Sequence, residues 1–162
     1  MTRPGPKLRT DVVDAYVVRC GPGAGPGAEL LQLRRAKEPL LGAWHPVMGH
    51  IEQGETAVEA VYRELSEETG LARDAARAVW ALEQVHPFFL PGSDEIMLSP
   101  RFAVEVEADW EPSLNDEHDA ARWIGLHHAE RSFLWPGQHA AIAEIRSILK
   151  PGSALAESLR LP

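Results

Sequence analysis

The sequence has little cysteine and few basic residues. Cys20 is the single cysteine among 162 residues, so no internal disulfide can form, which is typical of a reducing compartment. Lysine and arginine number 16 against 24 aspartates and glutamates, and the net charge of −8 argues against a general surface for a nucleic acid polymer. A small, phosphate-rich ligand remains compatible with this charge where a bound metal reverses it locally.

Long hydrophobic runs are also absent. No apolar stretch reaches about 18 residues, the length that a membrane-spanning helix needs. Residues 1–7 lack the apolar segment of a signal peptide. We therefore expect a cytoplasmic protein that does not contact a membrane.

The order of predicted elements indicates one α/β domain. Apolar residues make up 44% of the chain, enough for a single domain over 1–162 with loose termini at 1–8 and 153–162. Glycine alternates with proline or alanine over 21–27, which predicts a turn. Patterning predicts strands at 11–19, 28–34, 79–90, 94–107 and 121–126, and helices at 55–69 and 136–149. This order predicts a mixed sheet covered on both faces by helices.

Three acidic residues share one turn of the first predicted helix. At about 100° per residue, Glu64, Glu67 and Glu68 fall within about a quarter of its circumference. Like charges at these spacings repel, so a bound cation explains them most simply. Oxygen ligands alone suit a hard metal, Mg²⁺ or Mn²⁺. The alternative is a solvated acidic helix.

An apolar stripe lies beside these acids. Val58, Val61 and Leu65 recur at helical spacing and predict a buried face. The acids lie next to this stripe and not opposite it, so they are expected at the edge of a cleft. Gly70 is expected to end the helix.

Residues 49–71 fill a nine-position pattern without a departure. The positions are Gly49, Glu55, Arg63, Glu64, Leu65, Glu67, Glu68, Gly70 and Leu71. Such a match arises by chance about one time in ten million in a chain of this length. The stretch resembles the Nudix box. The resemblance implies an α/β/α sandwich and a metal-dependent pyrophosphohydrolase that cleaves a diphosphate linked to another group, with Mg²⁺ as cofactor and Mn²⁺ as an alternative.

The resemblance also implies a role for each acid of the box. The metal ligands would be Glu64, Glu67 and Glu68, together with the backbone carbonyl of Met48. Glu55 would order the site, and Arg63 would pair with a neighbouring carboxylate; with Glu64 and Glu67 they form the predicted catalytic set. The proton acceptor is left open between Glu64 and an acid outside the box.

That outside acid is sought in residues 115–123. This segment resembles a later loop of the family, in which a glutamate several residues before a strand tryptophan reaches the metals. Glu117 holds this place, and Asp116 and Asp119 are its local competitors. Without the resemblance, Glu117 would be interpreted as a solvated loop residue.

Three further residues are candidates for substrate binding. Arg34 and Arg35 end the second predicted strand near the expected cleft, where one of them would contact phosphate; the alternative is that both are solvent-exposed. Trp44 stands where an aromatic ring would stack on a base or pterin, and the alternative is a core position. The seven histidines lack metal-ligand spacing and indicate structural or surface positions.

The residues before the box bear on the substrate. The run Trp44 to Gly49 resembles the subgroup that acts on dihydroneopterin triphosphate and dATP. We therefore predict hydrolysis of a nucleoside or pterin triphosphate to a monophosphate and pyrophosphate, by a monomer or homodimer. One alternative is a dinucleotide-type substrate such as a diadenosine polyphosphate, ADP-ribose or NADH. The other is a non-catalytic nucleotide-binding module, which retention of every acid of the box disfavours.

Overall fold

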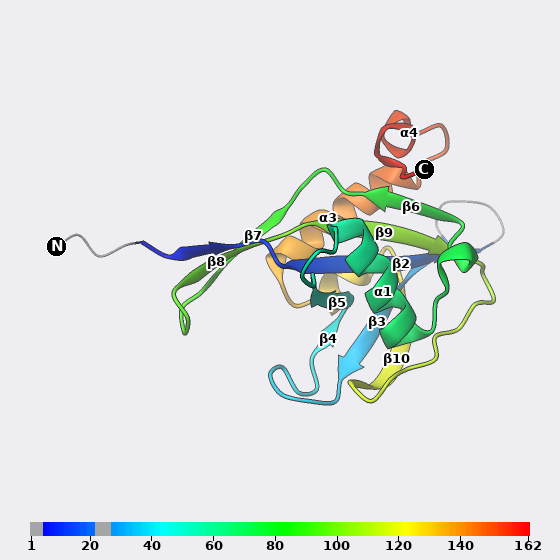
Figure 1. Cartoon of the computed structure of the whole chain (residues 1–162). Coiled ribbons are helices and arrows are strands. Elements are labelled where there is room, and N and C mark those ends of the chain that lie inside the picture. Colours follow the sequence, from blue (N-terminus) through cyan, green and yellow to red (C-terminus); the bar gives the residue numbers. More distant parts are fainter. Residues whose placement is uncertain (1–4, 22–26) are drawn as a thin grey trace.

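A central seven-stranded sheet lies between helices on its two faces (Figure 1). The computed structural model describes residues 5–21 and 27–162. Residues 1–4 of the predicted loose N-terminus and 22–26 of the predicted turn lie outside the described residues. The predicted α/β sandwich with a mixed sheet is confirmed.

The strand order of this sheet is β10-β3-β2-β9-β6, with β4 paired to β3 and β5 paired to β2. β2 and β9 run parallel, and the other pairs are antiparallel. The strands are β2 (Val12–Cys20), β3 (Ala28–Arg35), β4 (Trp44–His45), β5 (Val47–His50), β6 (Ala78–Ala81), β9 (Arg101–Val106) and β10 (His118–Gly125). The sheet is therefore mixed, as the sequence predicts.

A second sheet of three strands extends beyond the first (Figure 1). Its order is β1-β8-β7, formed by β1 (Lys7–Arg9), β8 (Glu95–Ser99) and β7 (His86–Leu90). The predicted strands 79–90 and 94–107 are thus each divided between two sheets. Pro100 separates β8 from β9, because proline has no N–H to donate to a ladder. The prediction of a loose segment at 1–8 is wrong at residues 7 and 8, which pair in parallel with β8.

Alternation along β2 supplies both halves of the core. Val13, Ala15 and Val17 pack on the face covered by α1 (Ala57–Thr69). Tyr16 and Val18 pack on the opposite face, under α3 (Pro136–Ile148) and near α2 (Ala129–Ser132). The helices α1 and α3 therefore each bury one apolar stripe against the same sheet, and the edge of α1 is left to face a cavity.

The C-terminal segment is ordered and packed. It forms α4 (Ala154–Leu159), whose Leu155 and Leu159 contact the α3 half of the core. The indole N–H of Trp80 donates to the Ala156 carbonyl at 3.0 Å. The prediction of a loose tail over 153–162 is therefore wrong, because the half-buried leucines of the tail pack against the domain itself. A short 3₁₀ turn, η1 (Arg73–Ala75), follows α1.

None of the helices among the described residues is long and apolar enough to cross a membrane.

Candidate active site

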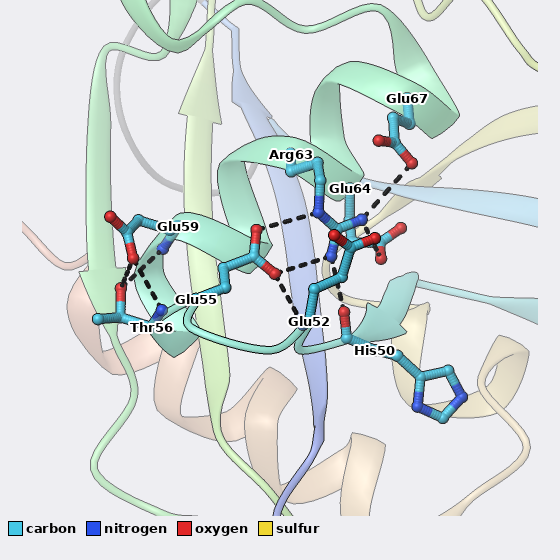
Figure 2. Close-up of polar contacts among 8 residues, drawn as sticks. All are labelled: His50, Glu52, Glu55, Thr56, Glu59, Arg63, Glu64 and Glu67. Atoms are coloured by element: carbon cyan, nitrogen blue, oxygen red, sulfur yellow. Dashed lines mark hydrogen bonds and ion pairs between the residues drawn. The ribbon is translucent and has the colours of Figure 1, made fainter.

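The helix that carries the acidic residues is fixed at both ends. The Thr56 hydroxyl accepts from the Glu59 N–H at 3.2 Å, while the Glu59 carboxylate accepts from the Thr56 N–H at 2.7 Å (Figure 2). This reciprocal pair is a capping box, so α1 begins two residues after the predicted start at Glu55. Gly70 ends the helix with a φ of 70°, a conformation that glycine adopts at little cost.

Arg63 lies among three of the predicted acids (Figure 2). Its guanidinium donates to both oxygens of Glu55, each at 3.0 Å, and to Glu64 Oε1 at 2.8 Å. It also donates to the His50 carbonyl at 2.7 Å, and the Glu67 carboxylate lies 3.5 Å away. Arg63 therefore ties α1 to the turn that precedes it and orients the carboxylates on both sides.

Glu64 passes directly over the backbone of β5. A Cβ atom added at Gly49 would stand 1.9 Å from the carboxyl carbon of Glu64. Side-chain atoms never approach this closely without moving, so the absence of a side chain at Gly49 is what admits the Glu64 carboxylate. The first glycine of the pattern and the first of its three clustered glutamates are thus in direct contact in space.

A cavity of about 660 Å³ joins the acidic edge of α1 to residues from other elements, a size common for small-molecule sites. Predicted site residues that line it are Arg35, Met48, Arg63, Glu64, Glu67, Glu68 and Glu117. They come from β3, β5, α1 and the loop before β10. A second cavity of about 600 Å³ is lined by Arg73, Arg77 and Arg160 and holds none of the predicted site residues.

Glu68 is the acid whose negative charge would be least compensated in the site. It is 2% exposed, and its Oε2 has no hydrogen-bond partner among the described residues. Burial raises the pKa of Glu68 to about 9, and the charges of Glu64 and Glu117 act in the same direction. His118 Nε2 lies 3.9 Å from this oxygen, too far for a hydrogen bond. Burial lowers the pKa of His118 to about 4, so its ring is neutral at pH 7 and does not offset the charge.

Glu64 is also perturbed. Burial raises its pKa, as do the nearby charges of Glu67 and Glu117, while Arg63 acts to lower it. A carboxylate with a raised pKa is a better proton acceptor near neutral pH than an ordinary one. Crowding of acids in one partly buried place is the physical cause of both shifts.

An oxygen-ligated divalent cation suits this donor set. The cavity presents four carboxylates, those of Glu64, Glu67, Glu68 and Glu117. Among residues 5–21 and 27–162, no three acidic, histidine or cysteine side chains already converge as metal ligands, and Arg63 contacts Glu64 and lies near Glu67. Arg63 contacts only Glu64 Oε1 and lies near only Glu67 Oε2, so the other oxygen of each carboxylate could bind an ion while Arg63 stays in place. The unpaired oxygen of Glu68 is the group that such an ion would satisfy.

Alternation along two strands divides the predicted substrate residues. Arg35 lines the cavity, and its guanidinium donates to Glu117 Oε2 at 2.7 Å. Arg34 instead pairs with Asp119 at 2.6 Å, outside the cavity lining. Trp44 likewise does not line it, and the Arg122 guanidinium lies 4.0 Å from its ring centroid. Arg34 and Trp44 therefore lie outside the cavity lining, because adjacent residues of a strand face opposite sides, and their contact with a substrate stays a prediction.

The competition among the acids of the later loop is resolved by their partners. Asp116 pairs with Lys37 at 2.6 Å, and Asp119 pairs with Arg34. Neither lines the cavity, whereas Glu117 does.

A family model described as NUDIX domain matches residues 10–145. The chain belongs to the Nudix family. Its Nudix box, Gly49 to Leu71, lies within the matched range. Membership and hydrolase relatives support the predicted enzyme class, a Nudix pyrophosphohydrolase, and Nudix hydrolases generally use divalent metal ions.

The chain is similar to proteins whose names describe different activities. An octanoyltransferase of Myxococcus xanthus is 36% identical over 125 residues, covering 75% of this chain and 32% of that protein. The chain thus spans about a third of the length of this relative. An RNA pyrophosphohydrolase of Legionella pneumophila (strain Corby) is 26% identical over 125 residues, covering 67% of this chain and 71% of that protein. A C. elegans Ap4A hydrolase binary complex has a TM-score of 0.71 at 18% identity, covering 87% of this chain and 98% of that one, which shows a shared fold.

The Nudix site also includes residues that the sequence prediction did not single out. His45 and Arg9 line the cavity. The rings of His45 and His118 lie 5.1 Å apart, and in both histidines Nε2 has no hydrogen-bond partner among the described residues. Alternation could have found His45, since it neighbours Trp44 on a short strand, but no local signal marks Arg9, whose place depends on pairing with β8.

Proposed function

We propose that this Nudix domain is a Mg²⁺-dependent hydrolase, with Mn²⁺ as a possible substitute, that cleaves a phosphoanhydride of a nucleoside or pterin triphosphate. The products are a monophosphate and pyrophosphate. The observation that carries the proposal is the buried Glu68, whose unpaired oxygen and raised pKa of about 9 create a need for a cation beside three further carboxylates. A phosphate chain bound there is brought next to that cation.

The protein supplies ligands, orientation and a proton acceptor. Glu64, Glu67, Glu68, Glu117 and the Met48 carbonyl are the groups that would hold the ion. When bound, such an ion offsets phosphate charge and lowers the pKa of a coordinated water. Arg63 and Glu55 keep the Glu64 carboxylate in place, and Arg35 lies beside Glu117 as a donor to a substrate phosphate. Glu64, which Arg63 orients at the edge of the cavity, is the acid we assign to proton uptake.

A substrate screen with products identified by mass tests the proposal. The panel contains nucleoside triphosphates, dihydroneopterin triphosphate, ADP-ribose, NADH and diadenosine polyphosphates, each with Mg²⁺ and with EDTA. Metal-dependent release of pyrophosphate from a triphosphate is the expected result. Turnover of a dinucleotide in place of a triphosphate would overturn the substrate assignment while retaining the hydrolase. Binding of a nucleotide without turnover would favour the non-catalytic alternative.

The second candidate function is hydrolysis of a dinucleotide-type substrate. The shared fold with an Ap4A hydrolase favours including it. Similarity to an RNA pyrophosphohydrolase adds a capped or triphosphorylated RNA end to the panel, although the net charge of −8 disfavours extended contact with a polymer. Assignment to the dihydroneopterin triphosphate subgroup, a single-domain monomer or homodimer, and a cytoplasmic location stay predictions of the sequence.

A further inference from the structure

The second cavity, of about 600 Å³, is separate from the one beside the Nudix box. Among the described residues, none lines both cavities. Its arginines come from three places in the chain: Arg73 from η1, Arg77 from the position before β6, and Arg160 from the position after α4. Three arginines therefore line one hollow of a chain whose net charge is −8.

The segment after α4 builds one side of this cavity. Arg160 forms an antiparallel bridge with Trp80 on β6, and the Leu161 N–H donates to the Val79 carbonyl at 2.8 Å. The Arg160 guanidinium also donates to the Arg77 carbonyl at 3.3 Å. This segment lies along β6, which is at one end of the strand order of the central sheet (Figure 1). Bonds to the backbone of β6 and of the residue before it thus hold Arg160 beside Arg77.

The helix α1 positions the third arginine. The guanidinium carbon of Arg73 lies 4.3 Å from the ring centroid of Tyr62, which is a cation–π contact. This contact uses the flat face of the guanidinium, so the N–H donors in its plane remain available to a ligand. Tyr62 lines the second cavity whereas its neighbour Arg63 lines the first, so adjacent residues of α1 face different cavities.

The arginines of the two cavities differ in their partners. Every arginine that lines the first cavity pairs with a carboxylate. In the second cavity Arg77 pairs with Glu107 at 3.0 Å, but within the described ranges neither Arg73 nor Arg160 has a carboxylate within 4 Å. Glu157 is the one acidic side chain among the described lining residues. The second cavity therefore has an excess of positive charge in a protein whose acids outnumber its bases.

From this geometry we propose that the second cavity binds a small anion of the phosphate class, either a free anion or the phosphate group of a nucleotide. Guanidinium groups donate paired hydrogen bonds to phosphate and carboxylate oxygens. A terminal phosphate offers three acceptor oxygens in three directions, whereas a carboxylate offers two in one plane. Arginines that approach from three segments suit the phosphate better. The site is independent of the proposed hydrolase function, because it shares no lining residue with the first cavity.

Calorimetric titration of the full chain with inorganic pyrophosphate in EDTA tests this site. Without metal, the carboxylates of the first cavity repel an anion, so binding reports on the second. Arg73→Gln removes an exposed, unpaired charge and is expected to raise the Kd about tenfold, since a charge-assisted hydrogen bond is lost. Arg73→Lys keeps the charge without the planar fork and is expected to lie between. Arg131→Gln, which changes an exposed arginine that lines neither cavity, is the matched control.

The outcomes decide for or against the site without any measurement of turnover. Weaker pyrophosphate binding in Arg73→Gln but not in Arg131→Gln, at an unchanged melting temperature, supports it. Absence of binding to wild type, or equal affinity in Arg73→Gln, would overturn it. Binding that is weakened by Arg35→Gln alone would place the anion in the first cavity and reject the proposal.

Two further titrations define the ligand. Malonate, a dicarboxylate, is compared with inorganic phosphate at pH 8, where the two carry similar charge. Phosphate is expected to bind more tightly, and equal affinity would overturn the assignment to the phosphate class. ADP distinguishes the sources: if it binds more tightly than pyrophosphate and is weakened by Arg73→Gln, the ligand is a nucleotide, and otherwise a free anion. Failure of the hydrolase proposal would leave each of these results unchanged.

Discussion

The two ends of the cavity are built in opposite ways. The acidic end comes from one stretch of 23 residues, Gly49 to Leu71, in which Arg63 holds Glu55 and Glu64 and the helix is capped at both termini. The other end, which we call the ring wall, consists of the apolar lining residues Phe88, Leu90, Met97, Pro39 and Leu40. These residues come from β7, β8 and the loop after β3, which are far apart in the sequence. Dense charge and local hydrogen bonds define the first end, while apolar surface and long-range strand pairing define the second.

This difference indicates which part of the cavity performs catalysis and which part selects the substrate. Metal-assisted cleavage needs several carboxylates at fixed spacing, and one helical turn supplies that spacing locally. Recognition of the rest of the substrate needs only a surface of suitable shape, which any neighbouring element can provide. If the comparison is right, changes at the acidic end alter kcat, and changes at the wall alter KM.

Glu67→Gln gives the largest expected effect on the acidic end. Loss of one ligand charge is expected to lower Mg²⁺-dependent kcat about 10³-fold, since each fixed charge at a phosphoryl transition state contributes several kcal/mol. Because the Glu67 side chain is 56% exposed, the melting temperature without metal should hardly change. Steady-state kinetics and circular dichroism measure both quantities.

The matched control for this change is Glu59→Gln on the same helix. Glutamine still completes a capping box, and Glu59 does not line the cavity, so kcat should stay within about twofold of wild type. Full activity in Glu67→Gln would break the assignment of catalysis to the acidic end.

Gly49→Ala tests the close contact that admits Glu64. The new Cβ would meet the Glu64 carboxyl group at 1.9 Å, so the acid must move. Displacement of a reacting group by about 1 Å costs on the order of 10²-fold in rate, and we expect kcat to fall by about that factor. Gly92→Ala is the control, because an added Cβ there meets nothing within 4 Å. A variant with unchanged kcat would show that Glu64 acts from another position.

The acidic end was predictable from sequence because its geometry is local. Glu64, Glu67 and Glu68 depend only on helical periodicity, whereas Glu117 was predicted only through the resemblance to a later loop of the family. Arg34 and Trp44 lie outside the cavity lining whereas Arg35 and His45 line it, because one residue of register reverses the side of the sheet. The residue pairs Arg34–Arg35 and Trp44–His45 could not be resolved without knowing the partner strands.

The ring wall was not predictable for a different reason. Phe88 lies in a segment predicted as one strand, 79–90, but the strand is interrupted and β7 joins another sheet. Arg9 reaches the cavity only through parallel pairing of β1 with β8, which brings together residues more than 80 positions apart. The tail was missed for a similar reason, since the burial of Leu155 and Leu159 depends on tertiary packing.

Glu68→Gln tests the charge of the acidic end through stability. The pKa of Glu68 rises from 4.5 to about 9 on folding, so between these values the unfolded state binds fewer protons than the native state. Stability of the metal-free protein should therefore fall as pH rises from 5 to 8, and Glu68→Gln should lessen this fall. Mg²⁺ at 100 times its Kd should stabilise wild type by about 2.7 kcal/mol, and the variant by much less.

Thermal unfolding in EDTA and in Mg²⁺, at pH 5 and pH 8, measures these effects. Asp116→Asn is the control, because Asp116 pairs with Lys37 and does not line the cavity. Equal stabilisation of wild type and Glu68→Gln by Mg²⁺ would show that Glu68 does not bind the cation.

Arg9→Gln gives the smallest expected effect and tests the wall end directly. Arg9 pairs with Asp11 and, across the strands, with Glu95 at 3.1 Å, which ties β1 to β8 beside Met97. Its side chain is 32% exposed and the pair is screened by solvent, so loss of the cross-strand pair should lower the free energy of unfolding only slightly. A less rigid wall should raise the KM for a ring-bearing substrate about threefold through lost preorganisation, with little change in kcat. Lys7→Gln, on the same strand but outside the cavity lining, is the control for strand charge. If Arg9→Gln lowers kcat instead, the two ends of the cavity are not independent, and β1 contributes to catalysis as well as to substrate recognition.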